Sequence, residues 1–213
     1  MKVLVVLTSL VLALAGCSSS GSGDSAKSSG LSDQSGKCAT YCGLGLVPPQ
    51  PRPTFTLADT SGASFNFGTQ TAGVATLLYF GYTNCPDICP ATMADIGLAL
   101  KSLPVATQKK VDVVFVGTDV KRDTASSISQ WLKNFSAGTS AKFIGLRGTQ
   151  AQIDAAQAAT HVFLAEDDGA THSTQVLFFG PDNYARVQYV YNDSGEQKQI
   201  AHDVPVVLAG STG

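Results

Sequence analysis

Two cysteines at the end of a hydrophobic segment are the residues of this chain best placed for chemistry. Cys85 and Cys89 stand four positions apart, where the apolar run 74–82 gives way to a segment with helical spacing. Positions i and i+4 of a helix have Cβ atoms about 5 to 6 Å apart, whereas a relaxed disulfide needs about 3.8 Å. A single soft metal ion bridges the wider gap more easily, so the spacing favours a metal site.

Two prolines, Pro86 and Pro90, bear on where the helix begins. In a helix that began at Pro86, Pro90 would remove a backbone hydrogen bond and clash with the preceding turn. We therefore predict that the helix begins at Pro90, with Cys89 as its cap. The turn from Cys85 to Cys89 would then face the positive end of the helix dipole, which lowers thiol pKa values and favours thiolate.

The elements that position the cysteines alternate between strands and helices. Near-continuous apolar runs predict buried strands, and apolar residues at helical spacing predict helices. The predicted strands are 74–82, 111–116 and 143–146, with an opening hairpin of 55–57 and 65–67 and a late hairpin of 175–179 and 186–191; the predicted helices are 91–103, 126–135, 151–159 and 196–208. This order predicts an α/β fold of the thioredoxin-like type, with a central mixed sheet flanked by helices and an N-terminal hairpin.

The segment around the cysteines resembles a known family signature. Residues 80–90, Phe-Gly-Tyr-Thr-Asn-Cys-Pro-Asp-Ile-Cys-Pro, resemble the signature of the SenC/Sco family of membrane-anchored copper proteins. Residues 117–124, Gly-Thr-Asp-Val-Lys-Arg-Asp-Thr, resemble the family's segment after the next strand, and Thr171-His172-Ser173 resembles the segment that carries its third copper ligand. The likeness spans roughly residues 50 to 210.

The resemblance implies a copper site and a cellular role. In that family a thioredoxin-like domain binds one copper and helps build the binuclear copper centre of cytochrome c oxidase, which implies Cys85, Cys89 and His172 as ligands here. Thiolates select Cu(I), and an added imidazole also accommodates Cu(II). The implied partners are the copper-bearing subunit of the oxidase and, as a further candidate, another copper chaperone. Thr171 stands where the family usually has an acidic residue, so orientation of His172 by that neighbour is not implied.

Four charged residues near these motifs have two interpretations each. Asp119, Arg122 and Asp123 suit ordinary turn and helix-cap roles, and the resemblance adds that their loop lies beside the metal site and can contact partner proteins. Asp87 is either a turn former or a charge that modulates the thiolates. The sequence leaves both pairs of alternatives open.

The N-terminal segment predicts export and a lipid anchor. Lys2 and the apolar run 3–15 are typical of a signal peptide and too short for a permanent membrane span. The block 14–17, Leu-Ala-Gly-Cys, resembles the bacterial lipobox, in which cleavage precedes acylation of the cysteine, here Cys17. We therefore predict a signal peptide at 1–16, a lipidated flexible Gly/Ser-rich tether at 17–48 and the copper-binding domain at 49–213, held at the extracytoplasmic face of the cell membrane.

A second cysteine pair, Cys38 and Cys42, repeats the same spacing outside the family-like region. In an exported protein the first interpretation is a local disulfide that closes a small loop. The alternative is an auxiliary copper or redox pair that exchanges with Cys85 and Cys89. The prolines that follow, from Pro48 to Pro53, predict an extended spacer.

The two remaining histidines are interpreted as structural. His161 lies at the end of a predicted helix and is expected to be partly buried, and His202 lies among polar neighbours in the last predicted helix and is expected to be solvated.

Composition narrows the classes of function. The 213 residues carry a net charge of -2 with only 14 Lys and Arg, which gives no basic patch for nucleic acid. Two functions remain. The first is a copper chaperone for cytochrome oxidase, and the alternative is a thiol-disulfide reductase that acts on cysteines of an exported protein. His172 discriminates between them, because thiol-disulfide exchange needs no third ligand.

Overall fold

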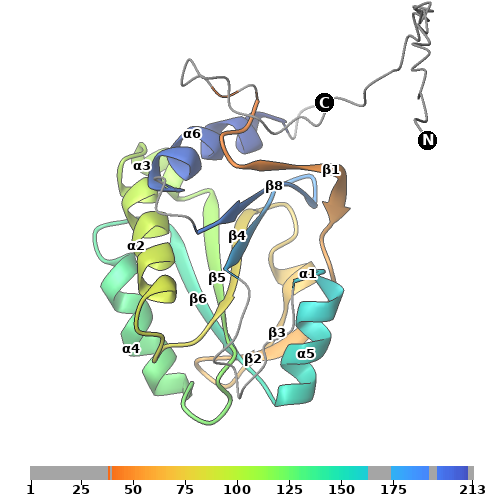
Figure 1. Cartoon of the computed structure of the whole chain (residues 1–213), viewed down its shortest axis with the longest axis vertical. Helices are drawn as coiled ribbons and strands as arrows, with labels where there is room; N and C mark the ends of the chain where they lie inside the picture. The colour runs from red at the N-terminus through yellow and green to blue at the C-terminus, as the bar shows by residue number, and fades with distance from the viewer. Residues whose placement is uncertain (1–37, 39, 163–173, 192–195, 211–213) are drawn as a thin grey trace, which may run out of the picture.

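Eight strands form one mixed sheet in the part of the chain that the structure describes. The structure is a computed structural model, and it describes residues 38, 40–162, 174–191 and 196–210. The strands are β1 (Leu44–Pro51), β2 (Thr56–Asp59), β3 (Ser64–Asn66), β4 (Ala75–Gly81), β5 (Val111–Gly117), β6 (Lys142–Arg147), β7 (Gln175–Phe179) and β8 (Tyr184–Val190). The helices are α1 (Phe67–Gln70), α2 (Ile88–Lys101), α3 (Val105–Gln108), α4 (Ala125–Ser136), α5 (Gln150–Ala159) and α6 (Glu196–Ala209) (Figure 1).

The strand order places β4 inside the sheet, where it can hold the cysteine segment. The order is β1-β8-β7-β4-β5-β6-β2-β3, with β4, β5 and β6 parallel and the remaining pairs antiparallel. Every residue of β4 is buried, as expected for a strand covered on both faces. Its carboxyl end leads directly into the cysteines.

Side chains alternate between two cores, one on each face of the sheet. Leu77 and Tyr79 point into a core shared with α2, α4 and α6, and Leu78 and Phe80 point into the opposite core with α1 and α5. Figure 1 shows these two groups of helices on opposite sides of the sheet. The α/β class, the mixed sheet flanked by helices, the hairpin of β2 and β3 and the hairpin of β7 and β8 are therefore confirmed.

The strand β1 was not expected from the sequence. It pairs antiparallel with β8 through Leu44 opposite Gln188 and Gln50 opposite Ala185, with an irregularity between Gly45 and Gln50. The predicted division between a tether at 17–48 and a domain at 49–213 falls inside this strand. Leu44 and Gly45, which the prediction placed in the tether, therefore pair with β8 at the edge of the sheet.

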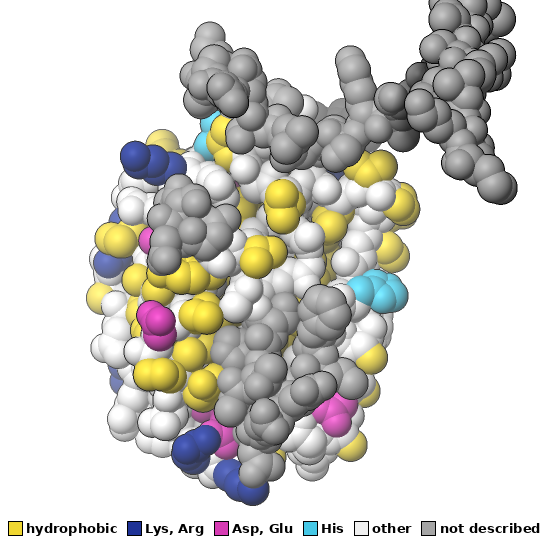
Figure 2. Space-filling view, in the orientation of Figure 1, with side chains coloured by type: hydrophobic (Ala, Val, Ile, Leu, Met, Phe, Trp, Pro, Cys, Tyr) yellow, Lys and Arg dark blue, Asp and Glu magenta, His cyan; other side chains and the backbone are white. Residues whose placement is uncertain are grey.

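Hydrophobic side chains and two of the histidines are found at the surface of the molecule. Hydrophobic side chains collect on the side of the molecule where α2 lies (Figure 2). His161 and His202 are both exposed, so the expected partial burial of His161 is wrong and the expected solvation of His202 is confirmed. No helix among the described residues is long and apolar enough to cross a membrane.

Candidate metal centre

Cys85 and Cys89 lie where β4 passes into α2, and neither forms a disulfide. The helix begins at Ile88 with Asp87 as its N-cap, and its Asp87 carbonyl accepts a hydrogen bond from the Ala91 amide at 3.2 Å. The predicted start at Pro90 is wrong. Pro90 is the third helical residue, a position whose N–H has no partner within a helix, so the proline costs no hydrogen bond.

The two thiols lie next to each other at the start of the helix. The Cys89 backbone N–H donates to Cys85 Sγ at 3.3 Å, and the two side chains hydrogen bond one another. Cys89 is fully buried, while Cys85 is half-buried. The geometry gives one accessible sulfur atom and one sulfur atom enclosed by the core.

The surroundings move the two thiol pKa values in opposite directions. Burial, the largest single influence, raises the pKa of Cys85, but hydrogen bonds from the Asp87 and Cys89 backbone N–H groups and from the Cys89 and Tyr82 side chains outweigh it, and the net shift is downward. Burial raises the pKa of Cys89 to about 12. The predicted lowering of thiol pKa is therefore confirmed for Cys85 and wrong for Cys89, because burial outweighs the donors at Cys89, whereas the donors outweigh burial at Cys85.

This asymmetry predicts a difference in reactivity. Because the pKa of Cys85 lies below the usual thiol value and the pKa of Cys89 is raised to about 12, Cys85 has the larger thiolate fraction, and its sulfur atom is also the less enclosed of the two. In the reduced protein without metal, iodoacetamide should alkylate Cys85 at least about 10-fold faster than Cys89. Peptide mapping by mass spectrometry after timed quenching measures both rates. Equal rates would contradict the assigned environments.

Three residues that the sequence analysis gave no role surround the thiols. The Tyr79 side chain interacts with the Cys89 thiol, and Tyr82 contacts Cys85 through its side chain and Cys89 through its backbone. Gly81 allows the close approach, because a Cβ at this position would lie 3.1 Å from Cys89 Sγ and 3.0 Å from the Tyr79 ring. In the sequence these three residues stood out only as neighbours of the cysteines in the motif. The sequence did not show that they contact the thiols.

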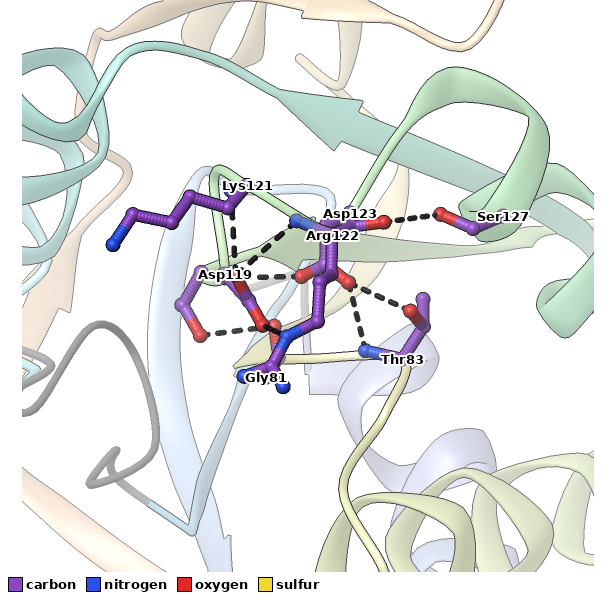
Figure 3. A network of polar contacts seen from close by, with 8 residues as sticks. Gly81, Thr83, Asp119, Lys121, Arg122, Asp123 and Ser127 are labelled. Atoms are coloured by element: carbon purple, nitrogen blue, oxygen red, sulfur yellow. Dashed lines mark hydrogen bonds and ion pairs between the residues drawn. The ribbon is translucent and has the colours of Figure 1, made fainter.

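Asp123 joins the cysteine segment to the loop after β5. Its Oδ1 accepts hydrogen bonds from the Thr83 N–H at 2.9 Å and the Thr83 hydroxyl at 2.7 Å, two residues before Cys85 (Figure 3). Its Oδ2 accepts from the Asp119 N–H at 3.1 Å. Burial raises the pKa of the Asp123 carboxyl against the opposing effect of these donors. Asp123 therefore holds two loops in register beside the thiols.

The other charged residues of this region divide between structure and surface. Asp119 is buried and forms an ion pair with Arg122, whose side chain is 58% exposed. The helix that follows is capped by Thr124, which accepts from the Ser127 N–H at 3.1 Å, and not by Asp123. Asp87 is the N-cap of α2 but makes no capping hydrogen bond with its side chain. Arg122 and Asp87 are thus exposed to solvent, whereas Asp119 and Asp123 are buried.

The remaining predicted site residues either lie outside the described residues or lie elsewhere in the fold. His172 and Cys17 lie outside the described residues, and so does the predicted signal peptide at 1–16. Cys38 and Cys42 form a disulfide, as the first interpretation predicted. They lie beside His202 in α6, and together these three residues are the group of metal-binding side chains that the described part of the chain brings within 4.8 Å.

The sequence is similar to a known protein family. A family model described as SCO1/SenC matches residues 48–209. The SCO2-like protein of Rickettsia felis is 36% identical over 117 residues, which is 54% of this chain and 53% of the relative. The match thus spans about half the length of that relative.

Solved structures agree with the fold. The apo Sco1 protein of Thermus thermophilus has a TM-score of 0.67 at 25% identity, over 80% of this chain and 99% of that chain. ScoI of Bradyrhizobium japonicum with copper bound has a TM-score of 0.60 at 25% identity, over 74% of this chain and 99% of that chain. The thioredoxin-like fold predicted from the order of strands and helices is confirmed.

Proposed function

The chain belongs to the SCO1/SenC family, and we propose that it is a copper chaperone that assists assembly of the binuclear copper centre of cytochrome c oxidase. The observation that carries the proposal is the adjacent pair of free thiols at the start of α2, one of them with a lowered pKa. Two sulfur donors suit Cu(I). The copper-bound structure of ScoI supports copper as the cargo.

The protein would hold copper through Cys85, Cys89 and His172. Cys85 supplies the more accessible thiolate, and Cys89 would give up its proton as the metal binds, since a coordinating thiol is deprotonated by the ion. His172 would complete the site and extend it to Cu(II). The proposed recipient is the copper-bearing subunit of the oxidase, and another copper chaperone is a candidate donor.

Replacing the proposed third ligand gives the experiment that tests this function. In His172→Ala, the affinity for Cu(II) should fall by about 100-fold or more, whereas Cu(I) should be retained by the two thiolates with a smaller loss. Competition with chelators of known affinity measures both constants, with His161→Ala as the matched control. A strain carrying His172→Ala should lose oxidase activity, and excess copper should partly restore it.

The alternative function is thiol-disulfide reduction on an exported protein, and one observation favours it as a second candidate. The accessible Cys85 with a lowered pKa and the enclosed Cys89 with a raised pKa match an attacking and a resolving thiol. In a reductase, both cysteine variants would be inactive and His172→Ala would behave like the parent. Equal Cu(II) affinity in His172→Ala and the parent would overturn the three-ligand site and favour the reductase.

The proposed location is the extracytoplasmic face of the cell membrane, with Cys17 lipidated. Cys17→Ser should release the protein from the membrane fraction or leave the signal peptide uncleaved, because the acylated thiol is lost while the fold is not touched. Fractionation with immunoblotting, together with intact mass, measures the outcome. If the variant fractionates and is processed like the parent, there is no lipid anchor at this cysteine.

A further inference from the structure

The buried carboxylate of Asp203 organises the surface around the second cysteine pair. Its side chain in α6 is fully buried and accepts hydrogen bonds from the Cys42 N–H at 2.7 Å, the Gly43 N–H at 2.9 Å and the Tyr189 hydroxyl at 3.1 Å. These bonds join the segment before β1 to α6, more than 150 positions later in the chain. The backbone beside Cys42 is thereby held at one place on the helix.

The same carboxylate also holds His202. The Nδ1 atom of His202 lies 2.8 Å from Asp203 Oδ1, so the Asp203 side chain engages one of the two ring nitrogens, and Nε2 is the nitrogen not used in this contact. A carboxylate that accepts from one imidazole nitrogen while the other remains open is the usual arrangement behind a metal-binding histidine. The His202 side chain is 45% exposed, so the imidazole is accessible from solvent.

Two sulfur atoms complete a donor set at this surface. One ligand atom each of Cys38, Cys42 and His202 lie within 4.8 Å of one another, although the cysteines are joined in a disulfide. A disulfide sulfur is a poor metal ligand, because the thiolate is the form that binds. Both cysteines are only partly buried. The three potential ligand atoms therefore already lie close together. Two of them, the sulfur atoms, cannot bind a metal ion as thiolates while the disulfide is intact.

We propose that Cys38, Cys42 and His202 form a second copper site that opens when the Cys38–Cys42 disulfide is reduced. An external dithiol supplies two electrons and two protons: its own two thiols become a disulfide, the bond between the Cys38 and Cys42 sulfur atoms breaks, and two thiols form. Cu(I) then binds both sulfur atoms and the imidazole with release of the thiol protons. Soft thiolate donors select Cu(I) over harder ions.

The site is separate from the copper site of the proposed function and does not depend on it. Cys38 and Cys42 precede the segment that matches the family, which begins at residue 48. Oxidation would close the second site, because it re-forms the bond between the Cys38 and Cys42 sulfur atoms. The number of copper ions that the protein carries would therefore depend on the redox state of its surroundings.

The test uses the full chain with Cys17→Ser, Cys85→Ser and Cys89→Ser, which leaves Cys38 and Cys42 as the remaining pair of its five cysteines. Cu(I) is titrated against a chromophoric Cu(I) chelator before and after reduction with a phosphine. We expect no tight Cu(I) binding before reduction and one Cu(I) per chain after it. Adding His202→Ala should weaken the reduced form at least about 10-fold and remove the nitrogen scatterer from its X-ray absorption spectrum.

Controls separate this proposal from the copper site at Cys85 and Cys89. His161→Ala in the same background replaces another exposed histidine and should leave Cu(I) affinity unchanged. Circular dichroism of each variant verifies the fold. No Cu(I) binding after reduction, or equal affinity with and without His202, would overturn the second site. In the complementary variant, Cys38→Ser with Cys42→Ser, one tight copper ion should remain, and its loss would instead count against the proposed function.

Discussion

Replacing either Cys85 or Cys89 with alanine will abolish tight copper binding while the Cys38–Cys42 disulfide stays intact. One thiolate and one imidazole are too few soft donors for Cu(I), so the affinity should fall by about 1,000-fold or more. Removing Cys89 also deprives the core of a fully buried side chain, whereas Cys85 is only half-buried. Chelator competition measures the loss on each metal-free variant, with the Cys38–Cys42 disulfide verified by intact mass.

The matched comparison is the double variant Cys38→Ser and Cys42→Ser, which removes two sulfur atoms elsewhere in the molecule. It should keep tight binding of one copper ion. Cys85→Ser and Cys89→Ser change the side-chain volume less than the alanine substitutions do. They test the same loss of copper affinity if an alanine variant does not fold. If either single variant retained the affinity of the parent, the thiol pair at the start of α2 would not be the copper site.

Replacing the buried Asp203 with alanine should cause a large loss of stability. The change leaves the Cys42 and Gly43 N–H groups and the Tyr189 hydroxyl without their acceptor. Buried donors that lose a charged acceptor are costly, and we expect the free energy of unfolding to drop by about 3 kcal/mol. Urea unfolding followed by fluorescence of the single tryptophan measures it.

The control for this variant is Asp154→Ala. Asp154 lies in α5, where its carboxylate accepts from the Gln150 side chain at 2.7 Å, a contact within one helix. Its loss should change the free energy of unfolding by at most about 0.5 kcal/mol. If Asp203→Ala were as mild, the link between α6 and the segment before β1 would contribute little to the fold.

The central strands were predictable because almost all of their residues are apolar. The run 74–82 is apolar almost throughout, and the structure buries all of β4 (Ala75–Gly81) between the two cores. The strand β5 (Val111–Gly117) is similar, with every residue buried except the half-buried Asp112. A strand covered on both faces needs no alternation of polar and apolar residues, so the apolar run itself is the signal.

The edge strand β1 was hidden for the opposite reason. Its sequence, Leu-Gly-Leu-Val-Pro-Pro-Gln-Pro, has the prolines of a spacer, and most of its side chains are exposed or half-buried. What makes it a strand is pairing with β8, which lies about 140 positions later in the chain. Local patterns carry no information about such a partner.

Within the site, the sequence indicated the cysteines but not what encloses them. Asp203 looks like a solvated residue in a mixed helix, because its four polar partners come from three separate segments. The helix start was predicted wrongly because of Pro90. A proline is tolerated at the first position of a helix and also elsewhere in its first turn, and the sequence does not distinguish these two cases. His172 stays a prediction.

The prolines of β1 also have a consequence for how copies of this protein meet. An unpaired edge strand presents N–H and C=O groups on which another chain can add a strand, which is a common route to aggregation. Pro48, Pro49 and Pro51 have no N–H group, and the pairing of β1 is interrupted between Gly45 and Gln50. The outer side of β1 is therefore a poor template for a further strand, and the sheet ends there even when many copies are crowded together.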